Sequence, residues 1–405
     1  MTTILAPSYH EAAVRDAIAQ CGARFADDPH GPQALFDAPA APGTGDAPGR
    51  AEGVSSGIGH GRVSLLPDWG LVSVSGPDAL AFLQGQTTND LAGQAPDEVR
   101  FNAYCTPKGR MLVSGPLWRD GEALRFAVSR ALAEPLRKRL SMFVLRAKAK
   151  VEDASNEVAI LGLTGEPAAD ALRDLGIEAP EPMRAARGSD PALLAIGFAP
   201  VAAVGPRWWL VVPVAVLAET WRRLAHRLAP ASSSWWRAGE ILAGEPRIVP
   251  ATSEMFVPQT VNWELVGGVS FRKGCYPGQE IVARMHYRGK PKRRGFAARL
   301  PGDPDSAPTP GTDLLAEGAN EPAGTVVGSA PAPGGGLVVL HEAVIDAALK
   351  GLLRTPDGRA LQALPLPYPL APDSGGKGDG ASGAATGTAD RTATATAAPT
   401  AADRQ

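Results

Sequence analysis

The sequence contains few cysteines and no long apolar run. Its three cysteines, Cys21, Cys105 and Cys275, lie far apart among 405 residues and form no C-x-x-C pair. An odd and sparse set argues against a disulfide framework and indicates reduced thiols. The first residues lack a basic segment followed by an apolar one, and no run reaches the roughly 20 apolar residues of a membrane helix. We therefore expect a cytoplasmic protein with no secretory signal and no membrane partner.

An excess of charge of either sign is missing as well. The 40 basic and 42 acidic residues nearly cancel, which leaves a formal net charge of −2. Any contact with nucleic acid must therefore come from a local patch. The sequence offers one such patch, formed by Arg284, Arg288, Lys290, Lys292, Arg293 and Arg294. The whole patch fits direct RNA binding, for example of tRNA. Its second part, Lys290, Lys292, Arg293 and Arg294, also fits a site for a polyglutamate or phosphate tail, or an ordinary charged linker between domains.

Strand and helix patterns alternate through the middle of the chain, with a hairpin expected around Gly205 and Pro206. This alternation favours an α+β fold over an all-helical one. We expect the tryptophans at 208, 209, 235 and 236 to be core or interface aromatics, with ligand stacking as the lesser alternative. Strands are predicted at 71–75, 109–118, 145–151 and 157–163, and helices at 8–21, 77–84, 129–143, 166–175 and 214–228.

The character of the sequence changes after residue 294. Short candidate strands separated by Pro/Gly turns predict a small β-barrel, with strands at 295–300, 324–329, 336–341 and 359–363. From residue 373 onward bulky apolar groups are rare, so burial cannot offset the entropy of ordering, and we expect a disordered tail. The predicted domains are an N-terminal lead with a Gly/Pro-rich flexible segment, a main region, the barrel and the tail, at 1–62, 63–289, 290–368 and 369–405.

Residues 270–294 concentrate the chemistry that the rest of the chain lacks. Cys275 follows Arg272 and Lys273, whose positive charge favours a thiolate, and a helix start near Gly278 would add to this effect. Glycines on both sides of the cysteine allow tight turns and close approach of a ligand. A free cysteine is also among the most buried residue types, so a functional thiol and a structural one both stay open. The other two cysteines have no such setting, and for them we favour a structural role.

The sequence shows no clear base or metal site beside Cys275. His286 lies eleven residues further on and is a candidate base, but a solvated surface histidine is the simpler interpretation. An iron–sulfur cluster needs several thiolates, and no second cysteine lies near. We therefore predict no resident metal site, and any cluster contact of Cys275 is expected to be shared or transient.

Five segments carry a resemblance. The most specific is K-G-C-Y-P-G-Q-E at 273–280, and the others are F-L-Q-G-Q-T-T-N-D at 82–90, Y-C-T-P-K-G-R at 104–110, G-E-P-R-I at 244–248 and F-V-P-Q-T-V-N at 256–262. In their order along the chain, these segments resemble the YgfZ family of folate-binding proteins, relatives of the glycine-cleavage T-protein (aminomethyltransferase). The similarity extends over roughly 71–294 and leaves the first 60 residues and the tail unexplained.

The resemblance implies a three-part ring of the T-protein type around a central folate-binding hole, with the barrel as its C-terminal part. It implies tetrahydrofolate or a derivative as cofactor, and a role in assembly or repair of iron–sulfur clusters. The implied partners are folate and client enzymes such as tRNA methylthiotransferases. The family's key cysteine corresponds to Cys275. The resemblance assigns folate contacts to Lys273, Gly274, Tyr276, Gly278, Gln279, Glu280, Asn89, Gln259 and Arg284.

One departure from the aminomethyltransferase pattern bears on activity. Those enzymes carry an acidic pair in a strand, where a carboxylate serves the folate amine chemistry. The equivalent residues 108–114 read K-G-R-M-L-V-S, and Leu112 and Val113 cannot transfer protons. We therefore favour a folate-binding accessory protein over a conventional enzyme, with Cys275 as the functional thiol. A folate-dependent aminomethyl or one-carbon transferase stays open as the alternative.

Overall fold

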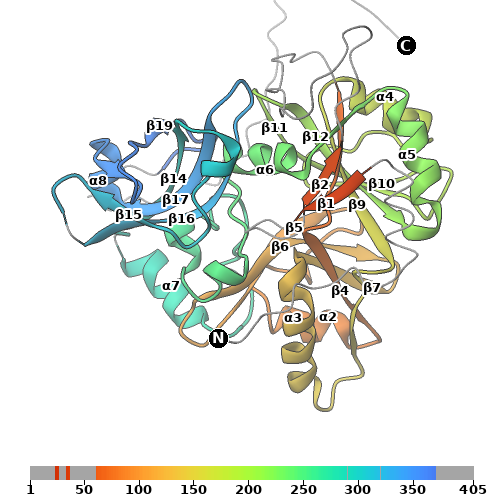
Figure 1. Ribbon diagram of the computed structural model, residues 1–405. Helices are drawn as coiled ribbons and strands as arrows, with labels where there is room; N and C mark the ends of the chain where they lie inside the picture. The colour runs from red at the N-terminus through yellow and green to blue at the C-terminus, as the bar shows by residue number, and fades with distance from the viewer. Residues whose placement is uncertain (1–22, 27–32, 37–60, 290, 320, 371–405) are drawn as a thin grey trace, which may run out of the picture. The chain divides into compact units, whose positions relative to one another are not determined.

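The computed structural model describes residues 23–26, 33–36, 61–289, 291–319 and 321–370. The chain divides into two units, Met1–Pro369 and Leu370–Gln405, and every element described below belongs to the first. That unit combines helices with three larger sheets and a hairpin (Figure 1), in which β1 (Ala23–Ala26) pairs with β2 (Gln33–Phe36). The predicted mixture of helices and sheets is confirmed. The helix predicted at 8–21 and the tail predicted from 373 lie outside the described residues.

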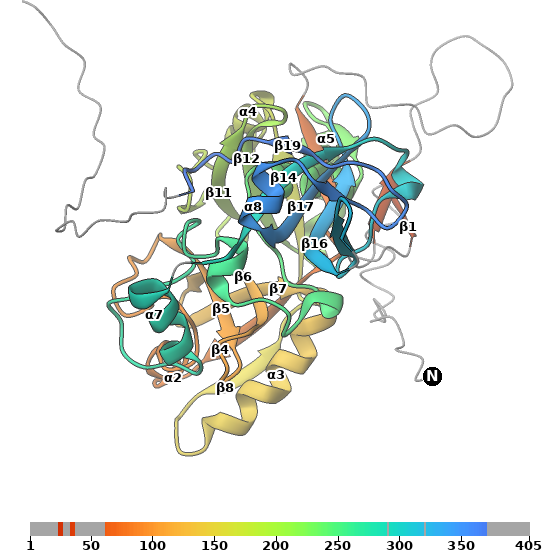
Figure 2. The ribbon, with the colours of Figure 1, turned by 90° about the vertical axis from the view of Figure 1, so that its left-hand side faces the viewer.

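The first larger sheet is antiparallel and carries α2 (Ala79–Gln84) and α3 (Arg130–Val144) on one face (Figure 2). Six of the seven residues of its strand β4 are buried, because both faces of the sheet are covered. In β6, a Cβ on Gly115 would lie 2.0 Å from the carbonyl oxygen of Ala127, so only glycine fits this close approach. The strand order is β5 (Val99–Cys105), β6 (Met111–Asp120), β7 (Ala123–Ser129), β4 (Trp69–Ser75) and β8 (Lys150–Asp153).

The second sheet is antiparallel except for its last pair, in which β13 runs parallel to β3. α4 (Pro167–Asp174) and α5 (Leu217–Ala225) pack on it through a leucine-rich core, and η1 (Val214–Val216) leads into α5. The strand order is β10 (Ala185–Arg187), β11 (Leu194–Val201), β12 (Gly205–Pro213), β9 (Val158–Thr164), β3 (Arg62–Leu65) and β13 (Ala229–Ala231).

The third sheet forms the C-terminal barrel. An isolated antiparallel bridge pairs Arg354 with Ala360, and α8 (Ile345–Leu349) packs into the core of this sheet. η4 (Pro304–Ser306) lies between the first two strands of the barrel in sequence. The strand order is β18 (Leu353–Arg354), β15 (Asp313–Ala316), β16 (Pro322–Pro331), β17 (Leu337–Val344), β14 (Arg293–Leu300) and β19 (Gln362–Leu364).

A central helix joins these parts. α6 (Ser233–Leu242) contacts β3 and β9 of the second sheet as well as β16 and β17 of the barrel. The largest apolar cluster draws on all three sheets and on this helix, so one core holds them together. Beyond α6 the chain passes through η2 (Pro250–Thr252) and η3 (Pro258–Val261) to α7 (Gln279–Arg288), which carries the predicted site.

Most predicted elements are confirmed, but two are wrong in part. Residues 145–149 form a turn rather than the start of a strand, and β8 begins only at Lys150. Leu145 has a φ of +43°, which ends α3 and breaks the extended run that its apolar and basic alternation predicts. The helix predicted at 214–228 ends at Ala225. Several short strands, such as β10, β13 and β18, were not predicted because each spans only two or three residues.

Candidate functional site

Lys273 fixes the loop that carries Cys275. Its Nζ donates hydrogen bonds to the main-chain oxygens of Gln84, Thr87 and Asn89, the last at 3.0 Å. These acceptors belong to the Q-G-Q-T-T-N segment, which contains the last residue of α2 and the turn after it, so two predicted motifs meet here. Burial lowers the pKa of Lys273 to about 8. Hydrogen bonds from a charged donor contribute about 1.5–3 kcal/mol each, which makes this lysine a strong clamp.

Tyr276 and Gly278 anchor the other side of the loop. The side chain of Tyr276 is buried, and its removal from water, together with the nearby Cys105, raises its pKa. Gly278 has a φ of +83° and directly precedes α7. A Cβ on it would lie 2.4 Å from the carbonyl oxygen of Thr106 and 2.6 Å from the Cα of Gly109. This contact joins the Y-C-T-P-K-G-R segment to the octapeptide and admits only glycine.

Cys275 lies exposed between these anchors. A Cβ on the preceding Gly274 would meet no atom within 4 Å, and the φ of Gly274 lies outside the left-handed region. The fold therefore gives no steric reason for a glycine at 274 and no packing reason for a cysteine at 275. Cys105 differs, because it is buried and burial raises the pKa of its thiol to about 12. A buried thiol of this kind is chemically inert.

The other residues predicted on and around α7 take framework positions. Gln279 begins the helix half-buried, and Glu280 follows it in the exposed first turn. Gln259 of η3 is buried, and its Nε2 donates to the carbonyl oxygen of Val282 at 2.7 Å, which fixes the helix to η3. The assigned folate contacts of these residues stay predictions.

Asn89 connects this loop to the centre of the molecule. Its Nδ2 donates to the carbonyl oxygens of Phe101 in β5, at 2.8 Å, and of Gly267, at 2.7 Å. Its main-chain N–H donates to Oδ1 of Asn102 at 2.9 Å, and its own carbonyl oxygen accepts from Lys273. The buried amide thus has its hydrogen-bonding groups engaged, and it holds β5 and the cysteine loop in one frame.

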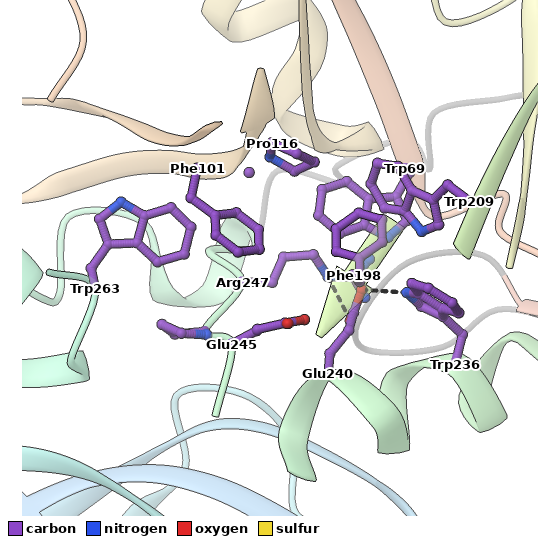
Figure 3. A pocket seen from close by; sticks show the side chains of 12 residues that line it. Trp69, Phe101, Pro116, Phe198, Trp209, Trp236, Glu240, Glu245, Arg247 and Trp263 are labelled. Atoms are coloured by element: carbon purple, nitrogen blue, oxygen red, sulfur yellow. Dashed lines mark hydrogen bonds and ion pairs between the residues drawn. The ribbon is translucent and has the colours of Figure 1, made fainter. Parts of the chain in front are cut away.

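Phe101 lies in the wall of a small aromatic cavity near α6 (Figure 3). Ring centroids are 5.3 Å apart for Phe101 and Trp263, and 4.8 Å apart for Trp69 and Trp209. The cavity measures about 20 Å³, which is room for about one water molecule. Its aromatic lining consists of Trp69, Phe101, Phe198, Trp209, Trp236 and Trp263.

Several tryptophans of the cavity wall carry polar atoms without partners. Among the described residues, the buried indole nitrogens of Trp69, Trp209 and Trp263 have no hydrogen-bond partner. A buried N–H left in this way costs about 1–3 kcal/mol, so three of them around one cavity need an explanation. Trp236 differs, because its N–H donates to Glu240 Oε1 at 2.8 Å (Figure 3).

Two buried carboxyl groups lie beside the cavity. Oδ2 of Asp68 accepts from Arg237 at 3.0 Å and from Arg247 at 2.6 Å. Burial alone would raise the pKa of Asp68, but the two arginines together lower it. Glu240 has a raised pKa because of burial, although Arg247 opposes the shift. The region beside the cavity therefore holds the carboxylate of Asp68 and the carboxyl group of Glu240, which takes up a proton more readily. Neither residue comes from 108–114, where the aminomethyltransferases carry their acidic pair.

A second, larger pocket opens along α7. We call it the α7 pocket; it measures about 560 Å³, and Arg284 is the one predicted folate contact that lines it. Much of the predicted basic patch meets here, whereas Arg294 turns to the carbonyl oxygen of Gln259 at 2.8 Å and to Glu264. Lys290 lies outside the described residues. The lining residues are Thr260, Ile281, Arg284, Met285, Arg288, Gly289, Pro291, Lys292 and Arg293.

The predicted base and metal chemistry can also be located. His286 is exposed and stacks on Phe271, with ring centroids 3.7 Å apart. Within the described parts of the chain, no group of three or more His, Cys, Asp or Glu side chains is arranged to hold a metal ion. None of the helices in these parts is long and apolar enough to cross a membrane.

Sequence reasoning missed most residues around the aromatic cavity. Asp68, Arg237 and Glu240 lie outside the five segments, and Arg247 lies inside one of them without having been singled out. The expectation that Trp209 and Trp236 are buried aromatics is confirmed. The one signal that could have drawn attention to this region is the dense occurrence of tryptophan next to charged residues at 68–69 and 235–240.

The fold defines the class of protein. The chain matches the glycine cleavage system aminomethyltransferase T from Bartonella henselae with a TM-score of 0.62, over 87% of this chain and 95% of that chain, at 14% identity. At this identity the likeness concerns the fold alone. The chain therefore has a T-protein-like fold, as the sequence predicts.

Sequence similarity then gives the family. Over 324 residues the chain is 33% identical to the tRNA-modifying protein YgfZ of Yersinia pestis (strain Pestoides F), which covers 79% of this chain and 96% of that protein. The protein of the same name from Escherichia coli O139:H28 is 32% identical over 308 residues, 75% of this chain and 92% of that protein. No protein-family model matches the chain. The chain belongs to the YgfZ family, which confirms the resemblance.

Proposed function

We propose that this protein binds tetrahydrofolate or a derivative and supports assembly or repair of iron–sulfur clusters in cytoplasmic client enzymes, with Cys275 as its functional thiol. The name shared by its relatives, tRNA-modifying protein, supports tRNA-modifying enzymes such as methylthiotransferases as clients. The cluster is cargo in this proposal, because the described residues offer no metal-binding group of their own.

The observation that carries the proposal is the double role of Asn89. Its side chain donates to the carbonyl oxygen of Phe101 in the cavity wall. Its own carbonyl oxygen accepts a hydrogen bond from Lys273, which lies two residues before Cys275. A ligand that moves Phe101 would therefore shift Asn89, and with it the hydrogen bond that holds the cysteine loop. This connection supports a folate site and an exposed thiol that respond to each other.

The wall of the aromatic cavity has the chemistry that a pterin needs. Phe101 and Trp263 offer ring faces for stacking, and the unpartnered N–H groups of Trp69 and Trp209 offer donors to ring nitrogens or the carbonyl. Asp68 is not a lining residue, but it precedes Trp69 of the wall. Its Oδ1 is buried without a hydrogen-bond partner among the described residues, and we expect it to become an acceptor for ring N–H groups when the rings separate. The present volume of about 20 Å³ is far below the roughly 150 Å³ of a cavity that binds benzene. Binding therefore requires the rings to separate.

Each side of the proposed site has its own task. Bound tetrahydrofolate supplies a reduced pterin that carries one-carbon groups. The clamp of Lys273, the buried Tyr276 and the glycine contact at 278 hold the loop, so that Cys275 presents its Sγ to a partner without a change of fold. A loop that is already held in place loses less conformational entropy when a client enzyme binds.

A thiol-protection experiment tests both halves of the proposal together. Iodoacetamide should alkylate Cys275 and leave Cys105 unmodified, because only the first is exposed. Saturating tetrahydrofolate should lower the rate of alkylation of Cys275 by about threefold or more. Peptide mass mapping measures this rate. Trp209→Phe, which keeps a ring but removes one unpartnered donor, should weaken folate binding, with intrinsic tryptophan fluorescence as the signal.

Function in cells gives the second half of the test. Cys275→Ala should fail to restore tRNA methylthiolation in a strain that lacks this protein, whereas Cys105→Ala should restore it. Full restoration by Cys275→Ala would remove the role of the thiol. Turnover of lipoyl-bound aminomethyl groups with tetrahydrofolate would instead establish the transferase alternative, for which Glu240 would be the carboxyl group to test.

A further inference from the structure

The α7 pocket contains positive charge that the protein does not neutralise. Among the described residues, Arg284, Arg288 and Lys292 have no hydrogen-bond or ion-pair partner for their side chains, and no acidic residue lines the pocket. Arg293 differs, because Glu342 lies 2.6 Å from its Nη1. Three uncompensated cations around one hollow attract a ligand with more than one negative charge.

The helix explains how an apolar surface comes to lie beside these charges. Ile281, Arg284, Met285 and Arg288 are spaced three and four residues apart, so they share one face of α7. Ile281 is 37% exposed, which is unusual for isoleucine and leaves apolar surface at the pocket. Lys292 reaches the same pocket from the residues before β14. The lining therefore combines apolar and cationic side chains.

A simple anion would not need the apolar side chains, and an apolar ligand would not need the cationic ones. The volume of about 560 Å³ lies within the usual range for pockets that hold organic molecules. Guanidinium groups suit phosphate because two N–H groups can bind two of its oxygens at once. A nucleotide combines a phosphate with a flat, largely apolar base and a sugar.

We infer that the α7 pocket binds a phosphorylated nucleotide unit. Its phosphate contacts Arg284, Arg288 and Lys292, and its base or sugar covers Ile281 and Met285. A free nucleotide and one unit of an RNA strand present the same chemistry. The inference depends neither on folate binding nor on the thiol of Cys275, so its test is independent of the test of the proposed function.

Fluorescence anisotropy with a labelled single-stranded RNA 12-mer at low salt tests the inference on the full chain. The double variant Arg284→Glu, Arg288→Glu should bind the RNA at least about tenfold more weakly. The matched control is Arg146→Glu, Lys148→Glu. It changes the net charge by the same amount at two exposed positions in the turn after α3, and should change binding by less than about twofold.

Competition identifies the source of the nucleotide. If AMP displaces the RNA, a free nucleotide is a ligand of the pocket; if AMP at millimolar concentration leaves the RNA bound, the ligand is a unit of a strand. Binding that falls equally in both double variants would overturn the inference, because general charge would then explain it. Absence of binding by RNA and AMP at low salt would overturn it too, as would competition by pentaglutamate with none by nucleotides.

Discussion

At the scale of single residues, the octapeptide contains two glycines that the structure requires to very different degrees. Gly278 has a φ of +83° and no room for a Cβ, whereas Gly274 has open space around it. Gly278→Ala should therefore lower the free energy of unfolding by about 2–4 kcal/mol, measured by urea denaturation. Gly274→Ala should leave it within about 0.5 kcal/mol of the wild type, because no contact and no strained backbone is involved.

The same pair separates stability from function. If Gly274 serves the approach of a ligand or client to Cys275, the stable Gly274→Ala protein should still lose tRNA methylthiolation in cells. A Gly274→Ala protein with both normal stability and normal function would show that residue 274 has no role in the site. A Gly278→Ala protein as stable as the wild type would contradict the close contact with Gly109.

The residues of the two candidate regions differ in how far the sequence could reveal them. Cys275 could be predicted because its neighbours form one continuous motif, and the partners of that motif lie in other recognisable segments. The wall of the aromatic cavity could not be predicted in the same way. Asp68, Phe101 and Glu240 come together only through the pairing of strands and the position of α6, and no local pattern announces that.

At the scale of elements, β17 contains a buried titratable group that makes the barrel sensitive to acid. His341 is buried, and burial lowers its pKa to about 3. The unfolded chain takes up a proton on this residue near pH 6.5, but the folded chain does so only near pH 3. Between these values the unfolded state binds one more proton, so stability falls as the pH is lowered, by about 1.4 kcal/mol per pH unit.

A substitution in this strand measures the effect. His341→Phe keeps an aromatic ring beside Phe296, and it should reduce the loss of stability between pH 7 and pH 5 by about 2 kcal/mol, followed by urea unfolding at each pH. His226→Gln, at an exposed position after α5, is the matched control substitution. An equal pH dependence in wild type and His341→Phe would show that His341 does not titrate in this way.

Element prediction succeeded for several long patterns, missed the seven-residue β5, and failed at residues 145–149, where one backbone angle decided the outcome. β4, β6, β9 and α3 follow periodicities of seven residues or more. Residues 145–151 also alternate apolar and basic, but the φ of +43° at Leu145 turns the chain before β8. A left-handed backbone at leucine is sterically unfavourable and leaves no mark in the hydrophobic pattern.

At the scale of the whole unit Met1–Pro369, the charged centre around Asp68 holds the layers together. Asp68 lies between β3 of the second sheet and β4 of the first, and its carboxylate binds Arg237 of the central helix. Arg247, which follows that helix, binds the same oxygen and lies with its guanidinium 4.7 Å from the ring centroid of Trp69. One buried carboxylate therefore links the two sheets, α6 and the aromatic cavity.

Asp68→Asn tests this dependence. It leaves the size of the side chain nearly unchanged but removes the charge that two buried arginines face, and such a loss costs about 3–5 kcal/mol. We expect a fall of this size in the free energy of unfolding by urea denaturation, together with weaker folate binding. Asp174→Asn is the matched control, because Asp174 also pairs with an arginine, Arg227, but on the exposed surface, where salt and water screen the interaction. Equal and small effects of both substitutions would show that the centre is held by its aromatic packing and not by the charge of Asp68.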